Sequence, residues 1–212
     1  MLFAKAPRGG QVKTRLVPPL TSAEAAELHT AFVEDMLARL RAHTAFDVEL
    51  HTDVNTDAWR ASSVTRKLQI AGSLGLRMFH ALETALASGY QRAAIVGSDA
   101  PTLPPSYLES LLRSRADVAL GRAEDGGFWG ISAGRVSAKM FAGVHWSQPD
   151  TLDQTVHAIE AAGLSIEVGP TWFDIDGPAD LDRILAAPDL PPATKLWVDR
   201  HRGAIAGRTA TL

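Results

Sequence analysis

The chain has 212 residues, which suits one domain with at most a small appendage, and its apolar fraction of 46% is enough for a sizeable core. A net charge of -3, with no dense run of Lys and Arg, argues against nucleic acid and membrane surfaces as partners, and no segment has the length of a membrane span. The absence of cysteine excludes disulfides, thiolate zinc sites and a cysteine nucleophile. The amino-terminal stretch lacks the apolar run of a signal peptide, so we expect a cytoplasmic protein.

Strand and helix patterns alternate along most of the chain. Apolar or alternating segments predict strands at residues 1–6, 46–52, 67–71, 93–97, 117–121 and 128–132, with extended stretches at 166–168 and 172–175. Apolar residues at helical spacing predict helices at 21–43, 73–88, 104–115, 149–162 and 178–185. This order predicts an α/β fold with a mostly parallel sheet and helices on both of its faces.

The alternation ends near residue 187. We therefore predict one domain at residues 1–186 and a tail at 187–212 that packs on the domain or on a partner subunit. The tail carries the apolar patch Leu196-Trp197-Val198, which makes a homodimer one expected arrangement.

The most informative stretch is Ile95-Val96-Gly97-Ser98-Asp99-Ala100-Pro101, an apolar strand that ends at a carboxylate and a proline. Ligands of open α/β sheets bind just outside the carboxyl ends of such strands. We therefore favour Asp99 as a ligand for a substrate or a metal over the alternative that it only caps the turn with Pro101.

The first strand is followed by a Gly/Pro loop that carries four cations. Lys5, Arg8, Lys13 and Arg15 fall within eleven positions, around Gly9 and Gly10. Glycine lets the backbone approach an anion closely, and Lys13 and Arg15 would neutralise a diphosphate. The loop has neither the Walker pattern nor GxGxxG, and the alternative is a solvated loop.

A second glycine-containing segment, Gln69 to Arg77, allows two interpretations. Gly72 and Gly75 would make room for a base or a sugar, or else Ser73 caps the next helix and Arg77 faces solvent. The segment Glu124-Asp125-Gly126-Gly127-Phe128-Trp129 favours a hairpin turn, with an acceptor pocket as the alternative.

The segment Phe173-Asp174-Ile175-Asp176-Gly177-Pro178 places two carboxylates at alternate positions near a predicted strand end, so that they point the same way. Either would join Asp99 around Mg2+ or Mn2+, which prefer hard carboxylate oxygens. The alternative role for Asp176 is to cap the helix that follows.

Taken together, FAKAPRGGQVKTRL, QIAGSLGLRM, VGSDAPTLP, GRAEDGGFWGIS and DIDGPADL resemble a bacterial family. It is the radical-SAM/selenodomain-associated glycosyltransferase-like family of the nucleotide-diphospho-sugar transferase (GT-A) superfamily. The resemblance runs from residue 2 to about residue 185 and implies a three-layer α/β/α, Rossmann-like GT-A fold with a mixed sheet. It also implies more residues ahead of Phe3 in the first strand than this chain has.

The resemblance assigns a role to each matching position. Nucleotide contacts would come from Ala4, Lys5, Gly9, Gly10, Lys13, Arg15, Gly72 and Arg77. Asp99 would bind the metal with Asp176 or Asp174, and Asp99, Asp125 and Lys13 would serve catalysis. The chain departs from the family at Ser73, Arg122 and Gly130, and the last two bear on the acceptor side.

The resulting hypothesis is a metal-dependent transferase that moves a glycosyl group from a nucleotide-diphospho-sugar to an unidentified small molecule. A nucleotidyltransferase that uses a nucleoside triphosphate, like the molybdenum-cofactor and phospholactate enzymes of the same fold, is the first alternative. The missing Gly-x-Gly-x-Arg run favours glycosyl transfer. A catalytically degenerate nucleotide-binding protein and a hydrolase are the others.

Overall fold

The computed structural model describes residues 1–43 and 46–209, which form a mixed seven-stranded sheet flanked by α-helices. The strands are β1 (Leu2–Ala4), β2 (Glu49–Thr52), β3 (Thr65–Leu68), β4 (Ala93–Gly97), β5 (Val118–Ala123), β6 (Phe128–Ala133) and β7 (Ile166–Trp172). The α-helices are α1 (Ser22–Arg41), α2 (Leu74–Ala87), α3 (Pro105–Arg113), α4 (Thr151–Ala161), α5 (Pro178–Ala186) and α6 (Pro192–Thr209). The predicted α/β class with a mixed sheet is confirmed.

The chain divides into two compact units, which are described separately. Unit 1 comprises Met1, Leu68–Gly97 and Leu103–Asp174, and unit 2 comprises Leu2–Lys67, Ser98–Thr102 and Ile175–Leu212. Each unit therefore joins segments that are far apart in the sequence.

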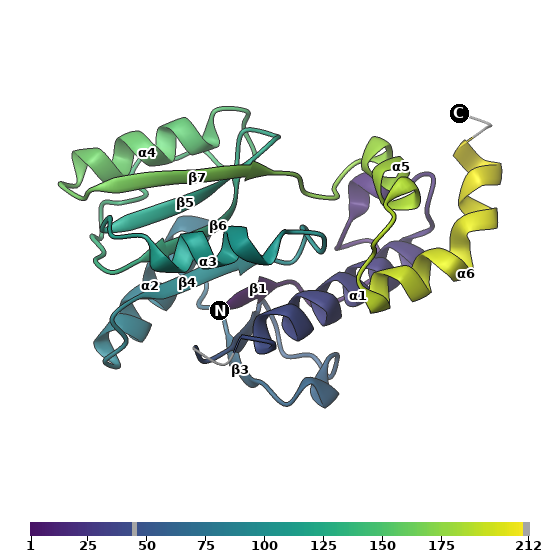
Figure 1. Cartoon of the computed structure of the whole chain (residues 1–212), viewed down its shortest axis with the longest axis horizontal. Helices are drawn as coiled ribbons and strands as arrows, with labels where there is room; N and C mark the ends of the chain where they lie inside the picture. The colour runs from purple at the N-terminus through teal and green to yellow at the C-terminus, as the bar shows by residue number, and fades with distance from the viewer. Residues whose placement is uncertain (44–45, 210–212) are drawn as a thin grey trace. The chain divides into compact units, whose positions relative to one another are not determined.

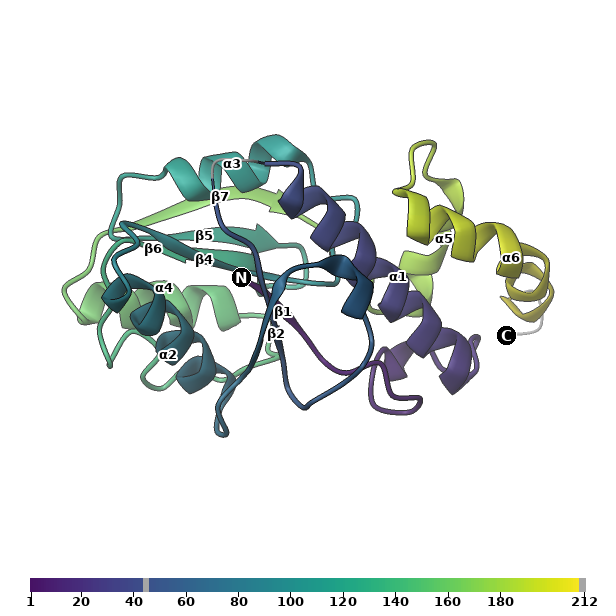
Figure 2. The same ribbon diagram turned by 90° about the horizontal axis from the view of Figure 1, so that it is seen from below.

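Unit 1 contains the strand order β4-β6-β5-β7. Strand β6 runs antiparallel to both β4 and β5, whereas β5 and β7 are parallel. Helix α3 covers one face of these strands, and α2 and α4 lie on the other (Figure 2). The predicted hairpin is present, because the turn at residues 124–127 joins β5 directly to β6.

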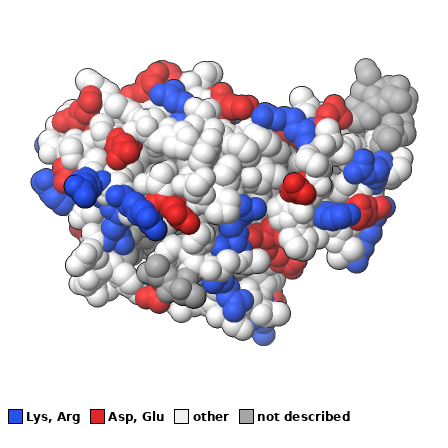
Figure 3. Space-filling view, in the orientation of Figure 1, with Lys and Arg blue, Asp and Glu red and all other residues white. Residues whose placement is uncertain are grey.

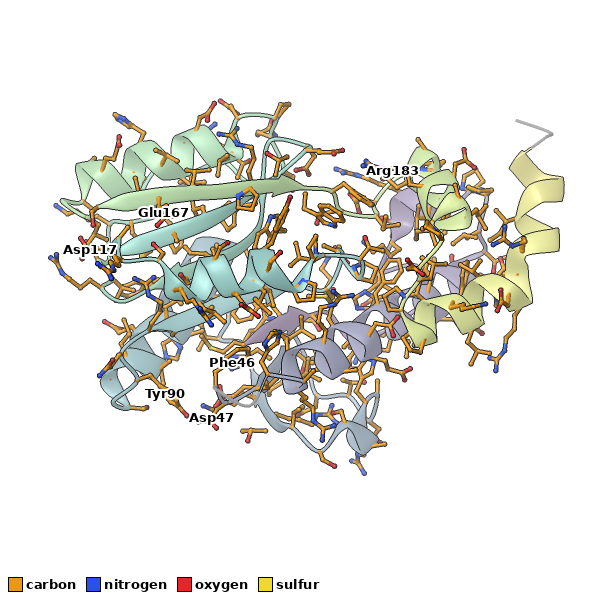
Figure 4. The ribbon with its side chains drawn as sticks, in the orientation of Figure 1. Phe46, Asp47, Tyr90, Asp117, Glu167 and Arg183 are labelled. Atoms are coloured by element: carbon orange, nitrogen blue, oxygen red, sulfur yellow. The ribbon has the colours of Figure 1, made fainter. Side chains whose placement is uncertain are left out.

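Two carboxylates accept hydrogen bonds at the amino-terminal ends of β5 and β7 in unit 1. Asp117 accepts hydrogen bonds from the backbone N–H and the hydroxyl of Ser165, both at 2.9 Å. Glu167 accepts one from the Ser114 hydroxyl at 2.6 Å. Asp117 and Glu167 lie at the same end of this part of the sheet (Figure 4).

Unit 2 is built around α1, whose start has a capping box. The Thr21 side chain accepts from the Glu24 backbone N–H, and the Glu24 carboxylate accepts from the Thr21 backbone N–H. The predicted apolar face is confirmed, since Leu28, Phe32 and Met36 are fully buried. Strand β2 pairs in parallel with β1, with Leu2 opposite Leu50.

The segment expected to be a tail contains the helix α6, which packs on α1 (Figure 1). The buried carboxylate of Asp35 on α1 holds the beginning of α6. It accepts from the backbone N–H groups of Ala193 at 2.9 Å and Thr194 at 2.7 Å, and from the Thr194 hydroxyl at 2.6 Å. A carboxylate at a helix amino terminus satisfies N–H groups that have no partner within the helix.

None of the described helices is both long enough and apolar enough to cross a bilayer. On the face shown in Figure 3, acidic and basic side chains are interspersed.

Candidate functional site

The loop between β1 and α1 has a special backbone at two positions. Gly10 has φ +77°, which glycine adopts without strain, and Lys13 has φ 49° and ψ 37°, in the left-handed region that other residues seldom occupy. Such strain persists where the surroundings hold it and is often found at functional sites. In this loop Lys5, Arg8 and Arg15 are exposed, whereas Lys13 is buried.

The Lys13 ammonium is the centre of the site, and every partner named here belongs to unit 2. Nζ lies 2.8 Å from Asp99 Oδ1, donates to the Ile175 carbonyl at 2.5 Å and lies 3.7 Å from Asp176 Oδ1. Only 3% of the Lys13 side chain is exposed. The other Asp176 oxygen, Oδ2, lies 2.7 Å from Arg15 Nη1. Tertiary structure thus brings together the predicted residues Lys13, Arg15, Asp99 and Asp176.

Asp99 is held as a carboxylate. Burial opposes its ionisation, but the Lys13 ammonium and the Ser98 hydroxyl, which donates at 3.1 Å, together lower the pKa of Asp99. The Asp99 side chain is engaged with Lys13 and Ser98, while its backbone carbonyl accepts from the Ile175 N–H at 2.8 Å. The Asp99 carboxylate is thus one of the two acidic groups that lie at the Lys13 ammonium.

The alternative role of Asp176 as a helix cap is wrong. The N-cap residue of α5 is Gly177, and the carboxylate that accepts hydrogen bonds at this helix start is that of Asp180, whose Oδ2 accepts from the backbone N–H groups of Asp176 at 3.0 Å and Gly177 at 2.7 Å. The Asp176 carboxylate therefore remains available to Arg15 and Lys13. The prediction that Asp174 and Asp176 alternate at a strand end is also wrong, because β7 ends at Trp172.

Two residues near the loop were not predicted as part of the site. The Nε2 of His29 on α1 makes a 2.9 Å hydrogen bond with the Lys5 carbonyl, and the backbone N–H of Ala6 donates to Asp53 Oδ1 at 2.7 Å. Burial lowers the pKa of His29, with Asp99 opposing that effect. Asp53 directly follows β2, the same sequence signal that drew attention to Asp99 after β4.

The remaining candidates for base and ribose binding lie in unit 1. Ser73 caps α2 by accepting from the Leu76 N–H at 3.3 Å. Gly72 has φ +125°, and Arg77 donates to the Gln69 side chain at 2.8 Å, so the guanidinium does not simply face solvent. The left-handed backbone of Gly72 and the hydrogen bond of Arg77 define the local structure of this segment, but they identify no ligand by themselves.

The other unit 1 candidates have structural partners. Asp125 is a turn residue, since its Oδ1 accepts from the Gly127 N–H at 2.9 Å. Trp129 is a core residue, 3% exposed, whose Nε1 donates to the Pro170 carbonyl at 3.3 Å. Asp174 is half-buried and ends unit 1. Ala4 and Gly9 belong to unit 2, at the end of β1 and in the loop after it.

The donor set fits a divalent cation that is shared with a phosphate ligand. Within residues 1–43 and 46–209 there is no group of three or more His, Asp or Glu side chains that would hold a metal by themselves. However, Mg2+ is commonly held by one or two carboxylates together with substrate phosphates and water. The pair Asp99 and Asp176, already gathered around one ammonium group, meets that requirement.

The fold is shared with solved structures of nucleotide-using transferases. A candidate nucleotide-diphospho-sugar transferase from Desulfovibrio desulfuricans G20 is 29% identical, with a match over 98% of this chain and 96% of that chain and a TM-score of 0.85. CMP:2-keto-3-deoxy-manno-octonic acid synthetase, solved with CTP, is 13% identical over 86% of this chain and 94% of that chain, with a TM-score of 0.54. A cytidylyltransferase from Leptospira borgpetersenii serovar Hardjo-bovis is 12% identical over 97% and 93%, with a TM-score of 0.53. The last two similarities show the fold alone.

The chain belongs to the family described as uncharacterized protein conserved in bacteria (DUF2064), whose profile matches residues 27–148. That stretch contains Gly72, Arg77, Asp99 and Asp125, whereas the loop with Lys13 lies before it and Asp176 lies after it. No curated protein matches the chain.

Proposed function

We propose that the protein is a metal-assisted transferase that uses a nucleotide-activated donor and moves a glycosyl group from a nucleotide-diphospho-sugar to a small-molecule acceptor. The observation that carries the proposal is the cluster in unit 2. Two carboxylates, Asp99 and Asp176, meet at the Lys13 ammonium, and the same loop presents exposed Lys5 and Arg15. Carboxylates for a cation and cations for phosphates are the two elements that a diphosphate donor requires. The similarity to a candidate nucleotide-diphospho-sugar transferase over almost the whole chain supports this choice.

In such a transfer the bond between the anomeric carbon and the diphosphate oxygen breaks, and its electron pair leaves on the diphosphate. The acceptor oxygen bonds to the same carbon and gives its proton to a base. Arg15 and Lys5 would bind the phosphate oxygens, and an arginine holds two of them at once. A divalent cation on Asp99 and Asp176 would supply further positive charge at the leaving diphosphate.

Three further assignments belong to the proposal. Gly72 and Arg77 are proposed contacts of the base and ribose, and Asp125 is proposed to act on the acceptor side. Asp174 is the alternative partner of Asp99 for the metal. Gly72→Val, Arg77→Ala and Asp174→Ala are tested in the binding assay described next, and Asp125→Ala is tested in the product analysis that follows it.

Titration calorimetry with UDP, GDP and CTP, with and without Mn2+, tests the proposal. We expect Mn2+ to tighten nucleotide binding and Asp99→Asn to abolish that effect. Asp57→Asn is the matched control, because Asp57 is a carboxylate of the same unit whose side chain is 81% exposed and pairs with Arg60. Nucleotide binding without any metal effect would instead support a catalytically degenerate nucleotide-binding protein.

Product analysis separates the possible reactions. Glycosyl transfer releases a nucleoside diphosphate, whereas nucleotidyl transfer consumes a nucleoside triphosphate and releases pyrophosphate. The fold shared with a CTP-bound synthetase makes nucleotidyl transfer the second candidate. Formation of free sugar or pyrophosphate in the absence of an acceptor would identify a hydrolase.

The location, the finer family membership and the oligomeric state of the protein are also part of the proposal. It would act in the cytoplasm, would be a member of the radical-SAM/selenodomain-associated glycosyltransferase-like family, and would form a homodimer through the α6 surface around Leu196, whose side chain is 52% exposed. Light scattering of Leu196→Asp, compared with the unaltered protein, tests the dimer: the variant is expected to have half the mass.

A further inference from the structure

The Lys13 ammonium is held by several defined contacts in the structure. It has three oxygen partners, namely Asp99 Oδ1, the Ile175 carbonyl and, at the longer distance of 3.7 Å, Asp176 Oδ1. It also lies 5.6 Å from the centre of the buried Phe32 ring, close enough for a cation–π attraction. The ammonium thus lies beside the two carboxylates that the proposed function assigns to a divalent cation.

Two cations cannot share this position. A divalent ion bound to the carboxylates of Asp99 and Asp176 would lie next to the Lys13 ammonium, which is 2.8 Å from Asp99 Oδ1 and 3.7 Å from Asp176 Oδ1, and like charges that close repel each other. Binding of a divalent ion to Asp99 and Asp176 therefore requires the ammonium to move. The lysine side chain is suited to such movement, because its charge sits on a flexible four-carbon stem with three rotatable donors.

On the basis of the proposed function, we infer that the Lys13 ammonium occupies the metal position in the unliganded protein and moves away from Asp99 and Asp176 when the metal binds. Without a ligand it holds Asp99 and Asp176, and with a divalent ion present it leaves them and binds a phosphate oxygen of the donor. The metal and the nucleotide then favour each other's binding. The metal releases the Lys13 ammonium to bind the phosphate, and the phosphate stabilises the displaced ammonium. Linkage requires the effect to be reciprocal, so each ligand tightens the other by the same factor.

Acetylation of lysines by acetic anhydride, followed by peptide mass measurement, tests this exchange in the unaltered protein. Lys13, 3% exposed, should be protected without ligands, become reactive with Mn2+ alone, and be protected again with Mn2+ and the nucleoside diphosphate together. Lys67 is the matched control, since it lies 2.7 Å from the Glu49 carboxylate but is 47% exposed, and its reactivity should not change. Protection of Lys13 in all three states, with Mn2+ and nucleotide demonstrably bound, would overturn the inference and leave the proposed function intact.

The variant Lys13→Gln provides a second readout. Without nucleotide it should bind Mn2+ at least about tenfold more tightly than the unaltered protein, because Asp99 and Asp176 no longer have a competing cation. The tightening of Mn2+ by nucleotide should be smaller in the same variant, because the contribution of the displaced ammonium is lost and only the direct contact between the metal and the phosphate remains. An unchanged or weaker Mn2+ affinity in Lys13→Gln would contradict the exchange, and failure of the unaltered protein to bind nucleotide at all would refute the proposed function itself.

Discussion

Asp180 accepts a hydrogen bond from the backbone N–H of Asp176 at 3.0 Å, and this contact separates the capping of α5 from the chemistry of the site. The Asp180 carboxylate satisfies the amino terminus of the helix, while the Asp176 carboxylate is directed to Arg15 and Lys13. One short segment therefore contains a structural carboxylate and one that we propose to be functional.

Replacing Asp180 by alanine should lower the free energy of unfolding by about 1 kcal/mol, the usual cost of losing a helix cap. It should also weaken metal-dependent nucleotide binding, because the backbone at Asp176 loses its anchor. Urea denaturation and titration calorimetry measure the two effects. Asp182→Ala, on an exposed position of the same helix, is the control and should change neither quantity appreciably.

Arg15→Gln should weaken binding of a nucleoside diphosphate by roughly tenfold, since a charge-assisted contact to phosphate is lost. The fold should be little affected, because the Arg15 side chain is 67% exposed and exposed ion pairs contribute little to stability. The comparison is with Arg60→Gln, which removes an exposed arginine paired with Asp57 in the same unit. Equal nucleotide affinity in the two variants would exclude Arg15 from the phosphate site.

His29 should make stability depend on pH. Burial lowers its pKa below the unfolded value of 6.5, so the unfolded chain binds the proton more tightly than the folded protein. The free energy of unfolding should therefore be highest above pH 6.5 and fall as the pH drops through 6.5 toward the folded pKa. His29→Gln removes this contribution, so the stability advantage of the unaltered protein should shrink between about pH 8 and about pH 5.5 in urea titrations. An advantage that stays constant or grows on acidification would contradict the assignment.

Gly121 and Gly169 face each other in the β5–β7 pairing and should respond differently to alanine. A Cβ on Gly121 would lie 2.1 Å from the buried Trp129 ring, whereas a Cβ on Gly169 would meet the Leu120 carbonyl at an ordinary 3.5 Å. Gly121→Ala should cost roughly 1–3 kcal/mol through overpacking, and Gly169→Ala should be close to neutral. Thermal and urea denaturation of both variants provide the comparison, and equal losses would show that strand conformation rather than Trp129 sets the cost.

Asp35→Ala should loosen α6. The three donors at the start of that helix would lose a buried charged acceptor, a change expected to cost about 2–4 kcal/mol. Limited proteolysis should then cut α6 while the rest of the chain resists. Asp199→Ala, which removes only an exposed pair with Lys195, should leave α6 resistant.

Much of the secondary structure and several site residues could be predicted from the sequence because their signals are local. The apolar spacing of α1, its capping box and the turn between β5 and β6 depend on residues within a few positions of one another. The same holds for choosing Asp99, since a carboxylate two positions after the end of an apolar strand is visible in the sequence. The mistaken expectation for Asp176 was also local: both Asp176 and Asp180 stand where a cap is plausible, and only the path of the backbone decides between them.

From the sequence alone we could predict the alternation of strands and helices, the cations of the first loop, and the carboxylates Asp99 and Asp176 of two other segments that carry the proposed chemistry. Tertiary structure decided which of those charges meet. Lys13 and Ile175 are 162 positions apart, and the burial of the ammonium between Asp99 and Asp176 results from packing that joins three distant segments into unit 2. Periodicity reports the environment of a residue along its own element, whereas the partner of a charged side chain is fixed by long-range contacts, which no local pattern encodes.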